Sequence, residues 1–198
     1  KQKVIICRDL KSDLEEAINL CPHDKLFILV DEHTHEFCLP LLSDFNCLKG
    51  IEIITIGASD VNKNIETLAS VWKELGDRGA TRHSLMINLG GGMVTDLGGF
   101  AASTFKRGIK YINIPTTLLA MVDASVGGKT GINFNGLKNE IGVFSPAEYV
   151  LIETEFLKTL DTQNLLSGYA EMLKHGLIST TRHWAELLPE NTGVMSRK

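Results

Sequence analysis

Five glycines and one aspartate lie within ten residues of the stretch Leu85–Phe105, LMINLGGGMVTDLGGFAASTF. The apolar run before Gly90 predicts a strand, and the small residues after Asp96 predict a closely packed helix. Glycines between a strand and a helix let a ligand approach the backbone, and the first helical turn offers free N–H groups to a phosphate. A tight turn alone does not need three consecutive glycines, so the pattern favours ligand binding.

The dinucleotide-binding fingerprint G-x-G-x-x-G matches this stretch only in part. Its glycines would be Gly90, Gly92 and the residue at position 95, which is Thr95. Asp96 complicates a bare phosphate site, although a carboxylate can cap the helix or accept a hydrogen bond from a hydroxyl. The stretch therefore resembles a phosphate-binding turn without having the third glycine.

A second glycine-rich segment, DASVGGKTGINFNGLKN, runs from Asp123 to Asn139. A Walker A loop would need a glycine at the position of Asp123, and a carboxylate there would face the phosphates, so a P-loop is excluded. A glycine turn presenting Lys129 remains, followed by a second loop presenting Lys138 and Asn139. These groups can hold a polar anionic molecule or belong to a solvated loop, and the residues leave both interpretations open.

The residues before this segment offer fewer signals. Pro115 ends a predicted strand, and Thr116 and Thr117 after it can act as helix caps or as hydroxyl ligands. The apolar run 118–122 predicts core packing. Arg107 can clamp an anion with two hydrogen bonds or be an ordinary surface charge.

The segment GYAEMLKHG, from Gly168 to Gly176, predicts a helix on which Glu171, Lys174 and His175 share one face. A glutamate and a histidine one turn apart can ligate zinc. An ion pair on a helix surface is the alternative, and for so small a group of residues the ion pair is favoured.

Short β-branched runs alternate with helical patterns along most of the chain. The runs predict six strands, at Val4–Cys7, Lys25–Val30, Ile51–Ile56, Leu85–Leu89, Tyr111–Ile114 and Tyr149–Ile152. Most are continuously apolar, as in parallel strands buried on both faces. The helical patterns place Leu14, Ala17 and Ile18 on one face and Ile65, Leu68, Ala69, Trp72 and Leu75 on another. This order predicts an α/β fold, a Rossmann-like open and mostly parallel sheet with helices on both faces.

The pattern changes near Leu160, after which the sequence is helical and contains no further strand. We therefore expect residues 1–159 to form the α/β domain and residues 160–198 to begin a helical domain. One or two helices cannot bury a core alone. These helices either pack against the first domain or belong to a longer chain.

The composition excludes several classes of protein. The 198 residues are 43% hydrophobic and 22% charged, as in a globular protein with a core, and the net charge of −4 gives no broad basic surface for nucleic acid. No apolar run is as long as a membrane span, and the N-terminal segment becomes charged too early for a secretory signal. The cysteines are irregularly spaced without a C-x-x-C motif, which predicts idle thiols: Cys7, Cys21, Cys38 and Cys47. We expect a cytoplasmic protein with no nucleic-acid or membrane partner.

Five motifs taken in order resemble 3-dehydroquinate synthase. They are GGGMVTDLGGFAASTFKRG, IPTTLLAMVDASVGGKTGIN, LKNEIG, FLKTL and GYAEMLKHG, and together they cover most of the chain from Leu85 to Ile178. The resemblance implies a metal-assisted, NAD-dependent cyclase of the shikimate pathway, and so of aromatic amino acid biosynthesis. The family converts 3-deoxy-D-arabino-heptulosonate 7-phosphate to 3-dehydroquinate with release of phosphate. NAD oxidises a ring hydroxyl, phosphate is eliminated, the hydride is returned, and an aldol reaction closes the carbocycle.

The resemblance also implies roles for individual residues. Contacts with NAD are implied for Asp31, His33, Asp60, Lys63, Gly91, Gly92, Met93, Asp96, Thr116, Thr117, Lys138 and Thr159. Contacts with the sugar-phosphate substrate are implied for Arg107, Asp123, Lys129, Asn139 and Lys174. Glu171 becomes a ligand of zinc, for which cobalt can substitute, whereas His175 matches no functional position. The family is usually a homodimer.

Several positions depart from the family pattern. His33 stands where the family usually has Asn, Asp60 where it usually has Glu, and Thr95 where many members have glycine, which would narrow the loop. The family takes two more zinc ligands, both histidines, from a later helical domain, and His183 follows Glu171 too closely to replace them. Catalytic zinc sites use three protein ligands. We therefore expect this chain alone to be inactive but able to bind NAD; a sister sugar-phosphate cyclase and a non-catalytic NAD-binding module are the alternatives.

Overall fold

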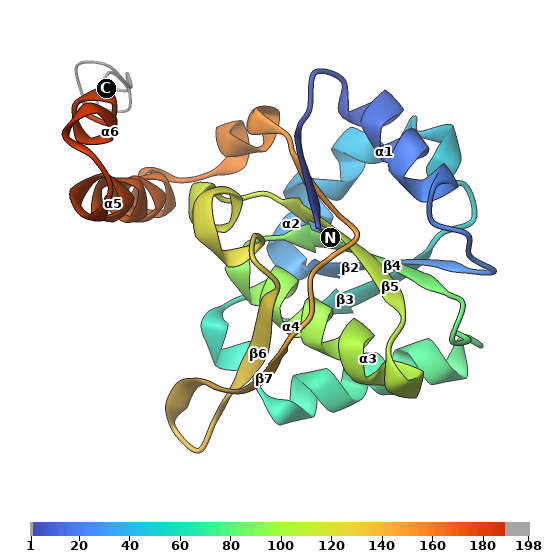
Figure 1. Cartoon of the computed structure of the whole chain (residues 1–198). Helices are drawn as coiled ribbons and strands as arrows, with labels where there is room; N and C mark the ends of the chain where they lie inside the picture. The colour runs from blue at the N-terminus through green and yellow to red at the C-terminus, as the bar shows by residue number, and fades with distance from the viewer. Residues whose placement is uncertain (1, 189–198) are drawn as a thin grey trace.

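The computed structural model describes residues 2–188, which contain a six-stranded sheet flanked by helices (Figure 1). All neighbouring strands in this sheet are parallel, and their order is β1-β8-β5-β4-β2-β3. The strands are β1 (Lys3–Ile6), β2 (Leu26–Asp31), β3 (Glu52–Ile56), β4 (Leu85–Gly90), β5 (Lys110–Pro115) and β8 (Tyr149–Ile152). The structure confirms the predicted fold class and places a strand at each of the six predicted runs.

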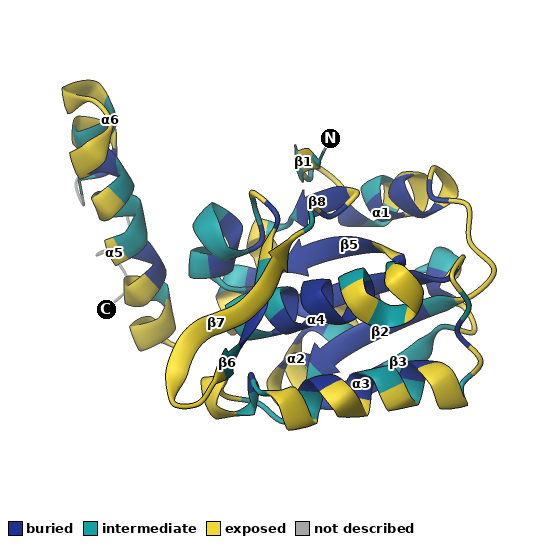
Figure 2. Ribbon diagram, turned by 60° about the horizontal axis from the view of Figure 1, so that its bottom comes forward, coloured by how far each residue is buried: buried dark blue, intermediate teal, exposed yellow. Residues whose placement is uncertain are grey.

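Helices cover both faces of the sheet. Side chains of α1 (Leu10–Asn19) pack on one face, whereas those of α3 (Ile65–Asp77) and α4 (Gly92–Thr104) pack on the other. The short helix α2 (Glu32–Phe37) follows β2 and leads to the single turns η1 (Leu39–Leu42) and η2 (Asn46–Leu48). Figure 2 shows α4 as the most deeply buried of these helices.

The alternation of side chains along the strands explains the two cores. Ile28 and Val30 of β2 face the α1 side, whereas Phe27 and Leu29 face the α3 and α4 side, and all four are fully buried. Such strands must be apolar throughout, which is why the sequence identified them. The two edge strands are exceptions, because most residues of β1 are exposed and only Ile54 and Ile56 of β3 are buried, so the prediction of burial on both faces is wrong for them.

Smaller corrections concern the helices. The helix α4 begins at Gly92, the third of the consecutive glycines, which is earlier than the small-residue run predicts. Ile65 and Ala69, both predicted on the buried face of α3, are exposed, and Val71 is buried there instead. In the run 118–122, predicted as core, only Ala120 and Met121 are buried.

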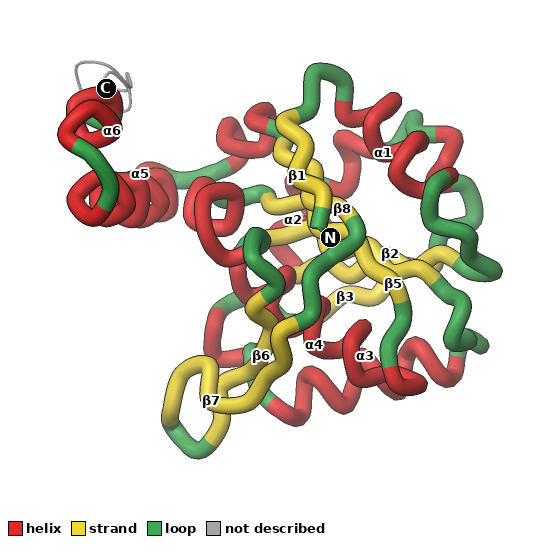
Figure 3. Tube along the Cα trace, viewed as in Figure 1, coloured by secondary structure: helices red, strands yellow, loops and turns green. Residues whose placement is uncertain are grey.

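A β-hairpin replaces the loop predicted around Lys138 and Asn139. Its strands β6 (Lys129–Phe134) and β7 (Leu137–Phe144) are antiparallel and stand apart from the main sheet (Figure 3). The turn residues Asn135 and Gly136 both have positive φ, at 50° and 77°, as a two-residue type I′ turn requires. The sequence therefore contained the Asn-Gly signal for this hairpin, and the loop prediction was wrong.

Two helices follow the sheet within the described residues. The helix α5 (Thr162–Ile178) and the short α6 (Thr181–Glu186) pack against each other and lie to one side of the sheet (Figure 1). Helix α5 approaches the main body closely at Gly168, where a Cβ atom would lie 2.5 Å from Cβ of Leu118. Among residues 2–188, no helix is both long and apolar enough to cross a membrane.

The strand order fixes where a ligand can bind. The chain leaves β2 toward β3 on one side and leaves β4 toward β5 on the other, so the connections separate between β2 and β4. In open α/β sheets, ligands bind at the carboxyl ends of the strands at such a point. Asp31 and Gly90 end these two strands.

Candidate cofactor and substrate site

The N-terminus of α4 lies at this switch point. Gly91 occupies the N-cap position without a side-chain hydrogen bond, whereas each of the other α-helices in residues 2–188 has one. The first backbone hydrogen bond of α4 runs from Thr95 N to Gly91 O, so the N–H groups before it face the end of the helix. This end of the helix can receive a negatively charged group.

Side chains pack closely against the glycines of this turn. A Cβ atom at Gly91 would lie 2.9 Å from Cγ2 of Thr117, and one at Gly92 would lie 3.3 Å from Cβ of Ala124. A side chain at either position would therefore crowd the neighbouring residues at the start of α4. The residues fit the pyrophosphate of a dinucleotide, as the resemblance implies.

A cleft of about 500 Å³ opens beside this turn. Nine predicted site residues line it: Asp60, Lys63, Gly92, Met93, Asp96, Thr117, Asp123, Lys129 and Asn139. They come from η3 (Asp60–Asn62) and the residue after it, from α4, from the bend between β5 and η5 that contains Thr117, from the π-helical turn η5 (Ala120–Ala124) itself, and from the hairpin. Predicted cofactor and substrate residues that lie far apart in the sequence therefore share one cleft.

A second cleft of about 150 Å³ adjoins the first, and Thr117 lines both. It contains the other predicted residues from the ends of the strands: Asp31, His33, Gly91, Thr116 and Thr159. The carboxylate of Asp31 caps α2, because its Oδ1 accepts hydrogen bonds from the backbone and hydroxyl of Thr34. The structure thus places Asp31 and His33 beside the glycine turn, where the adenosine half of NAD is expected.

Lys63 is the most deeply buried cation of the larger cleft. Its Nζ atom donates a hydrogen bond to Asp96 Oδ2 at 2.5 Å and another to Oδ1 of Asn139, and its side chain is 6% exposed. Burial raises the pKa of Asp96, although the charge and hydrogen bond of Lys63 oppose the shift. Lys63 therefore joins α4 to the hairpin inside the predicted site.

Asp60 forms a second link to the hairpin. Its carboxylate pairs with Lys138 at 3.1 Å and accepts a hydrogen bond from the amide of Asn133. Although burial alone would raise the pKa of Asp60, the hydrogen bond and charge of Lys138 lower it. Lys138, predicted to contact NAD, lies in β7 and does not line either cleft.

Asp123 lies in η5, a single π-helical turn, at the far side of the larger cleft. The amide of Asn113 and the hydroxyl and N–H of Ser125 hold this turn, since they donate to Ser125 O and Ala120 O respectively. Lys129 Nζ lies 3.4 Å from Asp123 Oδ1. Insertions of this kind in helices are frequent at functional sites.

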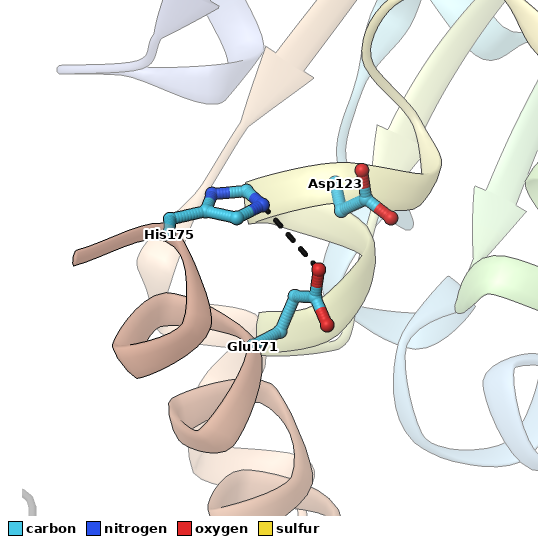
Figure 4. Close-up of side chains that lie close together, drawn as sticks. All are labelled: Asp123, Glu171 and His175. Atoms are coloured by element: carbon cyan, nitrogen blue, oxygen red, sulfur yellow. Dashed lines mark ion pairs between the residues drawn. The ribbon is translucent and has the colours of Figure 1, made fainter. Parts of the chain in front are cut away.

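Glu171, Lys174 and His175 share one face of α5, as predicted (Figure 4 shows Glu171 and His175). Both side chains contact Oε1 of Glu171, with Lys174 Nζ at 2.9 Å and His175 Nε2 at 3.3 Å. The structure therefore shows the ion pairs that the spacing predicts. Glu171 also approaches Asp123, which places it next to the cleft rather than in its lining.

Two predicted positions differ from the rest. Arg107 follows α4 and precedes β5, so it lies at the amino ends of the strands, roughly 20 Å along the helix from the glycine turn. Thr95 lies inside α4, where its hydroxyl donates to the carbonyls of Gly91 and Gly92, and it lines neither cleft. The expectation that Thr95 narrows the loop is therefore wrong.

Other residues of the site were missed from the sequence. Asn133 donates to Asp60, and its Oδ1 accepts from the backbone of Asn139, so it holds the hairpin against the cleft. Asn164 of α5 lines both clefts. The Asn-Gly turn would have placed Asn133 on a hairpin strand, whereas nothing in the sequence places Asn164 there.

Comparison with known proteins agrees with this geometry. Residues 53–167 match the family model described as 3-dehydroquinate synthase N-terminal. A 3-dehydroquinate synthase from Parabacteroides distasonis is 56% identical over 188 residues, which are 95% of this chain and 53% of that protein. The chain belongs to the 3-dehydroquinate synthase family. It spans about half the length of this curated relative.

Solved structures similar to this family member carry the same fold. One is 2-deoxy-scyllo-inosose synthase complexed with carbaglucose-6-phosphate, NAD+ and Co2+, with a TM-score of 0.80, 23% identity, and coverage of 91% of this chain and 49% of that one. Another is 2-epi-5-epi-valiolone synthase from Streptomyces hygroscopicus subsp. jinggangensis 5008 with NAD+ and Zn2+, with a TM-score of 0.76, 27% identity, and coverage of 98% and 60%. The fold of this 3-dehydroquinate synthase family member is thus the fold of sugar-phosphate cyclases.

Proposed function

We propose that this chain is the NAD-binding part of a 3-dehydroquinate synthase, a phosphate-eliminating lyase. The reaction is the cyclisation of 3-deoxy-D-arabino-heptulosonate 7-phosphate to 3-dehydroquinate with release of phosphate. One observation carries the proposal: in a chain of this family, most of the residues implied in cofactor and substrate binding line two adjoining clefts at the switch point of the sheet.

The cofactor half of the proposal uses the ends of β2, β4 and β5. The N-terminus of α4 receives the pyrophosphate, while Asp31 and His33 contact the adenosine end. When bound there, NAD would supply an acceptor for the hydride on the carbon that carries a substrate hydroxyl, and later the donor that returns it. The protein contributes a fixed position, since Gly91 and Gly92 admit the phosphates where side chains would block them.

The substrate half uses the charged rim of the larger cleft. Lys129 and Lys174 supply positive charge for an anionic sugar phosphate, and their exposed ammonium groups are able to reach toward it. Asp123 accepts hydrogen bonds from sugar hydroxyls, and the amide of Asn139 orients a further polar group. Glu171 is proposed as a ligand of a divalent metal, zinc or cobalt, which when bound polarises a hydroxyl as a Lewis acid.

A turnover assay tests this proposal. Phosphate release from 3-deoxy-D-arabino-heptulosonate 7-phosphate is measured with NAD and zinc, for this chain and for the full product of its gene. We expect turnover by the full product and none by this chain alone. Replacement of Asp123 by Asn in the full product should abolish most turnover and leave NAD binding unchanged, whereas equal loss of both would mark Asp123 as structural.

A sister cyclase is the second candidate, because the solved neighbours are named for other carbocycles. The same assay with a hexose 6-phosphate separates the two, since turnover of that substrate alone would identify the sister reaction. A non-catalytic NAD-binding module would bind NAD without turnover of any sugar phosphate by the full product.

The remaining expectations stay predictions. They are the domain boundary near Thr159, the homodimer, the shikimate pathway and a cytoplasmic location. Arg107 lies too far from the cleft of its own chain to contact a substrate there, so its implied role requires a second copy of the chain. Equilibrium sedimentation of the full product would test the dimer.

A further inference from the structure

Two asparagines lie side by side in the middle of the sheet. Asn88 of β4 and Asn113 of β5 are register partners in neighbouring parallel strands, and both side chains are buried. Nδ2 of Asn88 donates a hydrogen bond to Oδ1 of Asn113 at 2.9 Å. Helix α4 covers the pair so closely that a Cβ atom at Gly98 would lie 2.2 Å from Oδ1 of Asn88. A polar pair thus interrupts the apolar contact between α4 and the sheet.

This pair does not stabilise the core as apolar residues would. Among the described residues, Oδ1 of Asn88 is a buried acceptor without a hydrogen-bond partner. A buried polar atom left unpaired costs free energy that two apolar side chains of the same shape would not cost. What the pair provides instead is a hydrogen-bond donor at its other end, the Nδ2 group of Asn113.

The Nδ2 group of Asn113 reaches the residue that closes η5. It donates to the backbone carbonyl of Ser125 at 3.3 Å, directly after this π-helical turn. Ser125 is buried, and its N–H and hydroxyl both donate to the carbonyl of Ala120, five residues earlier. A hydrogen bond to the fifth preceding residue is the bond that defines a π-helix. A buried series of hydrogen bonds therefore runs from the centre of the sheet to η5.

The form of η5 decides where Asp123 points. Asp123 lies two residues before Ser125 and lines the larger cleft, and Figure 4 shows it on this turn opposite Glu171 of α5. A π-helical turn contains one residue more than an α-helical turn. Reversion to α-helical spacing would therefore rotate the residues on its two sides by about 100° relative to each other. The contact of Asp123 with Lys129 cannot prevent this, because it is exposed.

We propose that Asn113 is a positioning residue, whose amide holds η5 in the π-helical form that turns Asp123 toward the larger cleft. The inference rests on the proposed function for the role of Asp123 in binding substrate. Asn113 lines neither cleft, so it acts through Ser125 and the turn.

Replacement of both asparagines by leucine in the full product separates positioning from stability. The double variant Asn88→Leu/Asn113→Leu leaves no amide of this pair buried without a partner, so its melting temperature should equal or exceed that of the unchanged protein. Turnover of the heptulosonate phosphate should nevertheless fall at least about tenfold, since a displacement of about 1 Å can cost a factor of about 100. The affinity for NAD should stay the same.

Hydrogen exchange at the backbone amide of Ser125 measures the turn without an activity assay. This amide should exchange at least about tenfold faster in the double variant, because opening of the turn no longer breaks the bond from Asn113. The single variant Asn113→Leu should show the same faster exchange and the same loss of turnover, with a lower melting temperature because Asn88 then has no partner.

The matched control is Asn88→Leu alone. It removes one amide of the pair but leaves Asn113 able to donate to Ser125. The melting temperature should fall because Oδ1 of Asn113 loses its donor, whereas exchange at Ser125 and turnover should stay as in the unchanged protein.

The outcomes separate this inference from the proposed function. Unchanged exchange at Ser125 in both variants that lack Asn113 would overturn the role of Asn113, and faster exchange with unchanged turnover would overturn the positioning of Asp123. Equal loss of turnover in Asn88→Leu and the double variant would mark the pair as merely structural. Absence of turnover by the unchanged full product would refute the proposed function, while the exchange measurement would still decide whether Asn113 holds η5.

Discussion

The two sides of the larger cleft are built differently. On the α4 side, glycines bring backbone close to side chains, and the charged groups Lys63 and Asp96 are buried and bonded to each other. On the α5 side, Lys174 and His175 are exposed or half-exposed and both contact one oxygen of Glu171. The groups on the α4 side are thus fixed by burial and by their contacts with each other. The polar groups on the α5 side can instead be rearranged by a metal or a substrate.

This difference suggests that the α4 side binds the cofactor and the α5 side binds the substrate. Buried groups on the α4 side are set before any ligand arrives, which suits a cofactor that must be positioned with little loss of entropy. Exposed groups on the α5 side can exchange one ion-pair partner for another with little loss of free energy. This suits a substrate whose negative charge changes when phosphate is released.

Replacement of Lys63 by Met should have the largest effect on stability. It leaves the carboxylate of Asp96 buried without its cation, which costs about 3 kcal/mol in comparable buried pairs. Urea unfolding at pH 7 measures the loss. The control is Lys73→Met, because the pair of Lys73 with Asp77 is exposed and its loss should not change the unfolding curve measurably. Equal effects of the two variants would contradict the asymmetry.

Gly98→Ala should destabilise the α4 side by packing alone. The added Cβ would lie 2.2 Å from Oδ1 of Asn88 in the buried interface between α4 and β4. Overpacking of this kind costs about 2 kcal/mol. The melting temperature should fall by roughly 4–8 °C in a chain of this size. The matched control is Gly76→Ala in α3, where nothing lies within 4 Å and a gain of about 0.5–1 kcal/mol is expected.

The pH dependence of stability should report Asp96. Its pKa is raised in the folded chain because burial outweighs the attraction of Lys63, so the folded state binds more protons than the unfolded state above the ordinary pKa of 3.8. The contribution of Asp96 is therefore fully present below that pH and is lost as the pH rises through the raised pKa. Unfolding curves across this window should show this slope in the unchanged chain and lack it in Asp96→Asn.

Lys174→Met should have the smallest effect on stability. The pair of Lys174 with Glu171 is exposed and held by one helical turn, so its removal should leave the melting temperature within experimental error. A clear fall in the melting temperature would show that the α5 side is as rigid as the α4 side. Calorimetry of this chain measures the difference.

The strands of the sheet were predicted from the sequence, whereas only part of the site was. Strands such as β4 are apolar because both faces are covered, so burial itself produced the signal that identified them. The hairpin of β6 and β7 lacks such a signal, because β7 is exposed along its whole length. Its Asn135–Gly136 turn was the available evidence for it.

Pairings across the fold could not be predicted from spacing. Lys63 contacts Asn139 only because the hairpin folds over η3 and α4. The sequence around either residue does not indicate that the other is its partner. Glu171 and His175, in contrast, are one helical turn apart, so their contact followed from the sequence. The approach of Asp123 to this pair depends on close packing at Gly168, which spacing alone does not indicate.

Calorimetric titration of this chain with NAD tests whether the glycine turn at the start of α4 is a cofactor site. The account predicts saturable binding of one NAD per chain, weakened at least about tenfold, or 1.4 kcal/mol, in Gly91→Val, because the added side chain fills the turn beside Thr117. Gly76→Ala, on a helix away from the cleft, should bind NAD as the unchanged chain does. Absence of NAD binding, or equal affinity in Gly91→Val, would contradict the assignment of the α4 turn as the cofactor site.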